Sequence, residues 1–219
     1  MRKMWILFLK DMRLELRQRD MGALMIAFAV METLLFGFAL DSGDRLPVSE
    51  MAGILWMGFL FAGMLGIVRL FGRESKEDVM VGMAMAPGGR LPVVAAKMGV
   101  AWLFCVTTGM TATAMAVAVF QVPGTQISFA VVVVMLLGAL GVASVGTLLS
   151  SVSLNLSGHE VLLPVLTMPF LVPVAITGME ATRAVWTGGR PWPWIHALMA
   201  YDVVFMVLPL LLYEFLWEV

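Results

Sequence analysis

The sequence predicts an all-α polytopic membrane protein with six transmembrane helices. Hydrophobic residues make up 61% of the chain and charged residues only 13%, against about 25% charged residues in soluble globular domains. Six apolar stretches are long enough to cross the hydrocarbon core of a bilayer, which takes about 20 residues of helix. Each is expected to be helical, because a helix satisfies its own backbone polar groups in lipid. The predicted spans are Met21–Leu40, Met51–Phe71, Val93–Phe120, Phe129–Ser150, Val161–Met179 and Leu198–Trp217.

The segments between the spans must alternate between the two sides of the membrane. Most basic residues fall on one of these sides, which predicts the orientation of the chain. Lysine and arginine concentrate in the cytoplasmic segments of membrane proteins, so both termini are expected in the cytoplasm. The basic side carries Arg2, Lys3, Lys10, Arg13, Arg17 and Arg19 in the N-terminal tail, and Arg69, Arg73, Lys76, Arg90 and Lys97 around the loop after the second span. The opposite side carries Arg45, Arg183 and Arg190.

The length and the rarer residue types limit what else the chain can contain. Six spans fill most of the 219 residues, so we expect one membrane domain over residues 1–219. The net charge of −1 gives no reason to expect nucleic-acid binding. Cys105 is the single cysteine, so neither an intrachain disulfide nor a cysteine metal cluster is expected. His159 and His196 fall on opposite sides of the membrane, and we predict no metal site and no catalytic residue.

Residues 1–20 are predicted to form an amphipathic helix that lies in the membrane interface. On a helix, one face is apolar and the other is basic, a pattern typical of interfacial helices. The apolar face would carry Trp5, Phe8, Leu9, Met12 and Leu16, and the basic face Lys3, Lys10, Arg13 and Arg17. Two interpretations stay open: a simple membrane anchor, or an elbow helix that also touches a cytoplasmic partner.

The cytoplasmic loop over residues 72–92 contains signals for a short helix. Ser75 and Asp78 resemble a capping box, acidic residues suit the first turn of a helix, and Pro87 with the glycines after it would end the helix. Such a helix could be a docking surface for another protein or only a well-capped connector. The candidate docking residues are Ser75, Glu77, Asp78, Val79, Met80, Met83 and Ala84.

Glu32 and Asp202 are acidic residues inside predicted spans, where charge is costly and function is the first hypothesis. Glu32 falls midway along the first span, whereas Asp202 falls in the first turns of the sixth and so near the interface. The alternative for each is a hydrogen bond inside the bundle. We expect Glu32 to face the bundle or a subunit interface rather than lipid.

Three prolines in the fifth span, Pro164, Pro169 and Pro173, favour either a gating helix that lines a pore or a static kink. Small residues recur in two other spans at intervals that let helices approach closely. They are Gly138, Gly141, Ser144 and Gly146 in the fourth span, and Gly58, Ala62 and Gly66 in the second. Packing within one chain is the expected role, and contact with a second copy is the alternative.

Several of these stretches together resemble the haem exporter protein B family, CcmB, the permease subunit of the cytochrome c maturation ABC transporter. The stretches that carry the resemblance are Gly53–Trp56, Arg69–Phe71, Pro87, Ala96-Lys97, Trp102 and the leucine- and proline-rich Leu162–Leu171. Length, number of spans and orientation agree with it. The chain departs from the family at Val68 and Val81, where the family usually has Glu, and at Asp78, where Gly is common.

The resemblance implies an ABC-2-type exporter membrane domain whose elbow helix and docking helix rest on a separate ATPase subunit. The chain itself has no Gly-x-x-x-x-Gly-Lys-Ser/Thr phosphate loop. The implied partners are a CcmA-like ATPase, CcmC-like and CcmD-like membrane subunits and a CcmE-like haem chaperone, with two copies of this chain per complex in the inner membrane of a bacterium. The transported substance would be haem, or ATP hydrolysis would release the haem-loaded chaperone; no cofactor is expected to stay bound. The alternative is a secondary transporter that uses Glu32 or Asp202 as a proton site, although the chain shows no evident internal repeat of the kind many such transporters have.

Overall fold

The computed structural model describes residues 2–18, 20–40, 46–72, 91–122, 128–153 and 159–212, and nearly all of these residues lie in helices, with no strand among them. The helices are α1 (Arg2–Gln18), α2 (Asp20–Ala39), α3 (Val48–Gly72), α5 (Leu91–Val119), α6 (Phe129–Ser153), α7 (His159–Trp186) and α8 (Trp192–Leu212). The predicted all-helical fold is confirmed.

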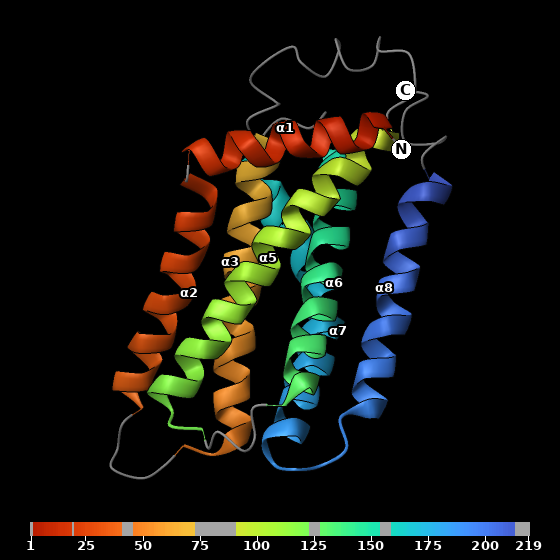
Figure 1. Ribbon diagram of the computed structural model, residues 1–219. Helices are drawn as coiled ribbons and strands as arrows, with labels where there is room; N and C mark the ends of the chain where they lie inside the picture. Colours follow the sequence, from red (N-terminus) through yellow and green to blue (C-terminus); the bar gives the residue numbers. More distant parts are fainter. Residues whose placement is uncertain are drawn as a thin grey trace.

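Six of these helices run up and down as a bundle, and α1 lies across one end of it (Figure 1). The helix α3 packs against α2, α5, α6 and α7, so it occupies the centre of the bundle. The helix α8 packs at the edge, against α6 and α7, while α1 packs mainly on α5. In this arrangement α2 and α8 stand at opposite edges (Figure 1).

Within the described part of the chain, five helices are long and apolar enough to cross a membrane: α2, α3, α5, α6 and α7. They correspond to the first five predicted spans. The helix α8 has a shorter apolar stretch over Trp192–Leu208 among the described residues. Its crossing of the membrane therefore stays a prediction.

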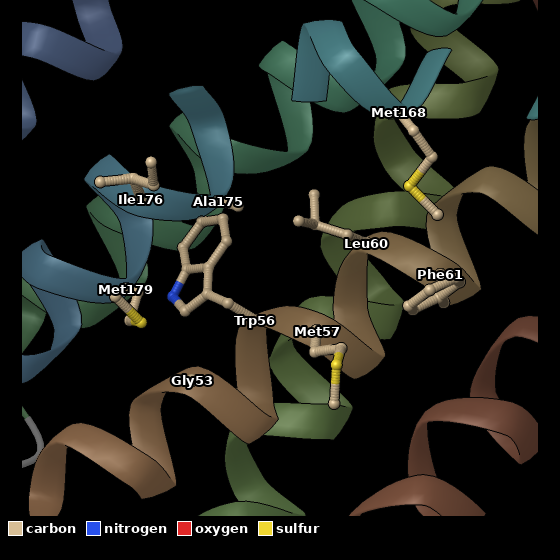
Figure 2. Close-up of a pocket in the computed structure, with 9 residues that line it drawn as sticks. All are labelled: Gly53, Trp56, Met57, Leu60, Phe61, Met168, Ala175, Ile176 and Met179. Atoms are coloured by element: carbon tan, nitrogen blue, oxygen red, sulfur yellow. The ribbon is translucent and has the colours of Figure 1, made fainter. Parts of the chain in front are cut away.

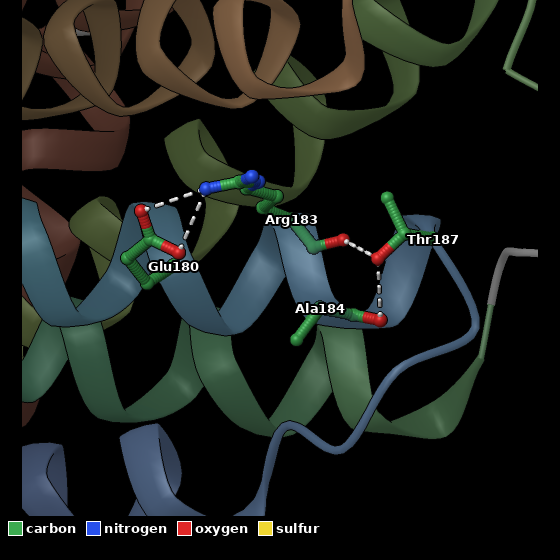
Figure 3. Close-up of polar contacts among 4 residues, drawn as sticks. All are labelled: Glu180, Arg183, Ala184 and Thr187. Carbon is green, nitrogen blue, oxygen red and sulfur yellow. Dashed lines mark hydrogen bonds and ion pairs between the residues drawn. The ribbon is translucent and has the colours of Figure 1, made fainter.

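The predicted end of the helix in the fifth span and the predicted start of the helix in the sixth are wrong. Residues 180–197 were expected to connect the two spans outside the membrane, but α7 continues to Trp186 and only residues 187–191 connect it to α8. Figure 3 shows the end of α7, where Arg183 pairs with Glu180 one turn earlier at 3.3 Å and the Thr187 hydroxyl donates to the carbonyl of Arg183 at 2.9 Å. Both contacts join residues three or four positions apart, which are neighbours on a helix surface. The polar residues are therefore compatible with a longer α7.

The turn after α7 follows from its glycines and the prolines beyond. Gly188 has a φ of 72°, a left-handed conformation that glycine adopts without strain. Its N–H bonds to the carbonyl of Val185, and the N–H of Gly189 bonds to that of Ala184, which is the hydrogen-bond pattern of a Schellman cap. Pro191 then accepts the first hydrogen bonds of α8, and Pro193 fits the first helical turn, where no N–H partner is needed.

The centre of the bundle is organised around the side chain of Trp56 on α3, which is 1% exposed. Its indole lies against Gly138 of α6 and Gly178 of α7, where an added Cβ atom would overlap the ring. Its Nε1–H donates to the hydroxyl of Thr182 on α7 at 2.9 Å. The indole therefore joins three helices, and the glycines are what let them approach.

Other small residues serve the same packing. Gly66 of α3 faces Met25 of α2, and Gly146 of α6 faces Ile67 of α3. On α5, the Nε1–H of Trp102 donates to the backbone carbonyl of Leu136 on α6 at 3.1 Å. The predicted role of the small residues in packing within one chain is confirmed at these positions.

The N-terminal helix is confirmed, but its apolar face is divided. Phe8 and Met12 pack on the bundle, with the Phe8 ring 3.3 Å from a Cβ atom added at Gly99 of α5. Trp5 and Leu16 are each 59% exposed, on the flank of α1. The bundle therefore covers part of the apolar face, because α1 rests on α5. The position of α1 in the membrane interface stays a prediction.

We predict that Gly138→Ala destabilises the fold by about 1–3 kcal/mol, because overpacking a filled core forces side chains out of their preferred positions. Gly53→Ala is the matched control, since a Cβ atom there would lie 3.6 Å from the sulfur of Met179, an ordinary contact. Thermal unfolding of both variants in lipid nanodiscs measures the difference. Equal melting temperatures for the two variants would contradict the packing described for Trp56.

Candidate functional site

The carboxyl group of Glu32 lies between α2 and α3. Both of its oxygens are buried and neither has a hydrogen-bond partner among the described residues. It lies against the backbone of Gly58 on α3, where an added Cβ atom would overlap the carboxyl. Nearby, Phe28 of α2 and Phe61 of α3 bring their ring centroids to 6.4 Å. The prediction that Glu32 faces the bundle is confirmed.

The carboxyl group of Asp202 is buried more deeply, and it does not lie in the first turns of its helix, where it was predicted. Because α8 begins at Trp192 and ends at Leu212, Asp202 lies ten residues from either end. It is 3% exposed, and neither oxygen has a hydrogen-bond partner among the described residues. A Cβ atom added at Gly141 of α6 would lie 3.1 Å from Oδ1 and 3.0 Å from Val174 of α7. The carboxyl therefore sits where α6, α7 and α8 meet.

The structure does not bring the two acidic residues together. Glu32 belongs to the α2–α3 contact and Asp202 to the α6–α7–α8 contact, on opposite sides of the bundle (Figure 1). Each faces a glycine of a neighbouring helix, so each fills space that a side chain would otherwise take. They are two separate candidate sites.

The three prolines lie inside α7, which continues through all of them. Hydroxyl groups bond to the backbone carbonyls beside them: Thr167 to Leu163 at 2.6 Å and Thr177 to Pro173 at 2.6 Å. From α8, the hydroxyl of Tyr201 donates to the carbonyl of Phe170, between the second and third prolines. The proline-rich part of α7 is thus braced by its own threonines and by α8.

A groove of about 200 Å³ opens between α3 and α7 beside Trp56 (Figure 2). No hydrogen-bonding group is free on its walls, since the indole N–H of Trp56 is used by Thr182. Its lining is apolar: Gly53, Trp56, Met57, Leu60, Phe61, Met168, Ala175, Ile176 and Met179. None of the three prolines of α7 is among these residues. The groove can accept an apolar group, and the methionines give it an adaptable surface.

None of the sequence motifs predicts this groove. A signal was present in two small residues that line the groove, Gly53 of α3 and Ala175 of α7 (Figure 2). Spacing on a single helix could not reveal the groove, because the groove depends on how the two helices pack.

Lys97 and Phe71, which both belong to the stretches that carry the family resemblance, make contact at the end of the bundle covered by α1. The ammonium group of Lys97 on α5 lies 4.9 Å from the ring centroid of Phe71 on α3, and Lys97 is only 4% exposed. This is the geometry of a cation–π interaction. The pair joins the helices on either side of residues 73–90, a role that the basic loop pattern alone did not predict for Lys97.

The predicted docking residues Ser75, Glu77, Asp78, Val79, Met80, Met83 and Ala84 lie outside the described residues. The side chain of His159 is also outside them, while His196 is exposed on α8. In the described part of the chain, no group of three or more His, Cys, Asp or Glu side chains could hold a metal ion.

We predict that Gly58→Ala costs about 1–3 kcal/mol in the wild-type background, since its Cβ atom meets the Glu32 carboxyl. In a Glu32→Ala background the same change should cost little, because the clash is removed and coupled neighbours are non-additive. Thermal unfolding of the four proteins in this cycle gives the coupling. Additive effects would show that Glu32 does not lie against Gly58.

Comparison with known proteins identifies the family of this chain. The family model described as "CcmB protein" matches residues 2–212. A protein of Paracoccus denitrificans named "Heme exporter protein B" is 28% identical over 208 residues, which cover 92% of each chain. Proteins of the same name from Rhodobacter capsulatus and Bradyrhizobium diazoefficiens are 28% and 26% identical, covering 80% and 89% of this chain and 79% and 89% of their own. The chain belongs to the CcmB protein family.

Proposed function

We propose that this protein is the membrane subunit of an ABC transporter that serves cytochrome c maturation, where a separate ATPase drives haem export or release of a haem-loaded chaperone. The observation that carries the proposal is the family match over residues 2–212, together with relatives named for haem export. The helical bundle with α1 across one end is consistent with it (Figure 1).

The end of the bundle under α1 is the proposed docking face for the ATPase. The helices α3 and α5 reach this end on either side of residues 73–90, and the Lys97–Phe71 contact holds them together. A fixed base is what a docking segment needs if it is to pass movement of the ATPase to the bundle. The residues Ser75, Glu77, Asp78, Val79, Met80, Met83 and Ala84 would make the contact.

The same end is proposed to face the cytoplasm. The exposed side of α1 carries Lys10, Arg13 and Arg17, and cytoplasmic segments are rich in such residues. The protein would then lie in the bacterial inner membrane with both termini in the cytoplasm. Trp5 and Leu16 on the flank of α1 would rest among the lipid head groups.

The complex is proposed to contain two copies of this chain, a CcmA-like ATPase, CcmC-like and CcmD-like membrane subunits and a CcmE-like chaperone. Haem is proposed as the transported substance and not as a bound cofactor. Glu32, Asp202, Pro164, Pro169 and Pro173 are the proposed coupling residues within the membrane.

A second candidate function, proton-coupled transport of a small molecule, is favoured by one observation. The two buried carboxyl groups have no hydrogen-bond partner among the described residues, and acidic residues within membranes often carry protons in transporters. Association with an ATPase separates the two candidates.

We predict that the double variant Met80→Asp, Met83→Asp no longer copurifies with the ATPase, because charge replaces the apolar surface of the docking helix. The measurement is the amount of ATPase that copurifies from membranes containing equal amounts of the inserted chain. The variant Met80→Leu, Met83→Leu keeps an apolar surface and should retain the ATPase. Undiminished ATPase with the aspartate variant would argue against docking through residues 75–85.

A further inference from the structure

Asp202 lies at the midpoint of α8, with its carboxyl group enclosed by α6 and α7. It is 3% exposed, and neither carboxyl oxygen has a hydrogen-bond partner among the described residues. We propose that Asp202 is a proton-binding site, occupied while α8 is packed on α6 and emptied when the two helices separate. The proposal does not depend on haem or on the ATPase.

The neighbouring polar groups are committed elsewhere. The hydroxyl of Tyr201, the adjacent residue, donates to the carbonyl of Phe170 on α7. The hydroxyl of Ser144, one turn from Gly141 on α6, donates to the carbonyl of Gly141 at 3.1 Å. Neither hydroxyl is placed to donate a hydrogen bond to Asp202.

Among the described side chains of α6, α7 and α8, no positive charge faces Asp202. The helix α6 has no charged residue along Phe129–Ser153. In the described side chains of α7, Arg183 is paired with Glu180 near the far end of the helix. On α8 itself, the remaining titratable groups in Trp192–Leu208 are Tyr201 and the exposed His196, six residues away.

A carboxylate in this position would be a buried charge without compensation, which is strongly unfavourable. A protonated carboxyl avoids that cost and fits the small space that Gly141 leaves. Packing of α8 on α6 therefore favours the proton-bound form. Conversely, the carboxyl can ionise only where water reaches it, and water reaches it when α8 moves away from α6.

The direction of the pH dependence follows. Below the pH at which a hydrated aspartic acid ionises, both states hold the proton and pH does not shift the balance. Above it, the separated state gains stability with each increase in pH, because that state releases the proton and the packed state does not. The α6–α8 contact should weaken as the pH rises.

Infrared spectroscopy of the full chain in lipid nanodiscs tests whether the proton is bound. At neutral pH the wild-type protein should show the C=O stretching band of a protonated carboxyl, and Asp202→Asn should remove the part due to Asp202. Glu180→Gln is the matched control: Glu180 is paired with Arg183, so this change should remove only a carboxylate band. If Asp202→Asn instead removes a carboxylate band, the proposal is wrong.

Should Asp202→Asn fail to insert, Asp202→Glu retains an acid and should retain a protonated-carboxyl band at a shifted frequency. A carboxylate band in its place would equally overturn the proposal. Hydrogen exchange then tests the link to α8. After correction for the intrinsic effect of pH, exchange of α8 amides should rise from neutral to alkaline pH in the wild type and stay flat in Asp202→Asn, with α5 as the internal reference. Equal pH dependence in both proteins would refute the link.

Discussion

The position of Trp56 between two glycines is the contact on which the bundle depends. Gly138 and Gly178 let α6 and α7 close on the indole ring of α3, and Thr182 accepts its N–H at 2.9 Å. In lipid there is little hydrophobic drive for helices to associate, so close packing and interhelical hydrogen bonds must hold them together. The side chain of Trp56 provides both the close packing and the interhelical hydrogen bond where α3, α6 and α7 meet. The groove between α3 and α7 lies directly beside this contact (Figure 2).

The two buried acidic side chains, like Trp56, each pack against a glycine of a neighbouring helix. Glu32 lies against Gly58 and Asp202 against Gly141, so each carboxyl is enclosed by a backbone that approaches closely. Charge inside a membrane is unfavourable, and a group kept there is more readily explained by function than by stability. Since α2 and α8 are at opposite edges of the bundle, separate movements of the two edges would expose the two acids separately.

Hydropathy predicted the helices well because each apolar stretch meets the length that a bilayer requires. It failed at the end of α7, because the predicted fifth span ended at Met179, just before the polar residues Glu180, Arg183 and Thr187. Those side chains instead pair along the helix surface, and the actual end is set by the left-handed Gly188. The predicted place of Asp202 along its helix was wrong because α8 begins at Trp192, before the predicted start of the sixth span. Trp56 and Lys97 were identified from the resemblance, but what they contact depends on packing between distant segments, which hydropathy does not describe.

The central claim is that the end of the bundle covered by α1 receives an ATPase. A photo-crosslinking amino acid placed at position 10, on the exposed side of α1, tests this most directly. The comparison is the same amino acid at position 187, which follows the end of α7 away from α1. In membranes from cells that contain the whole system, our account predicts a crosslink to the ATPase from position 10 and none from position 187. A crosslink from position 187 but not from position 10 would contradict it.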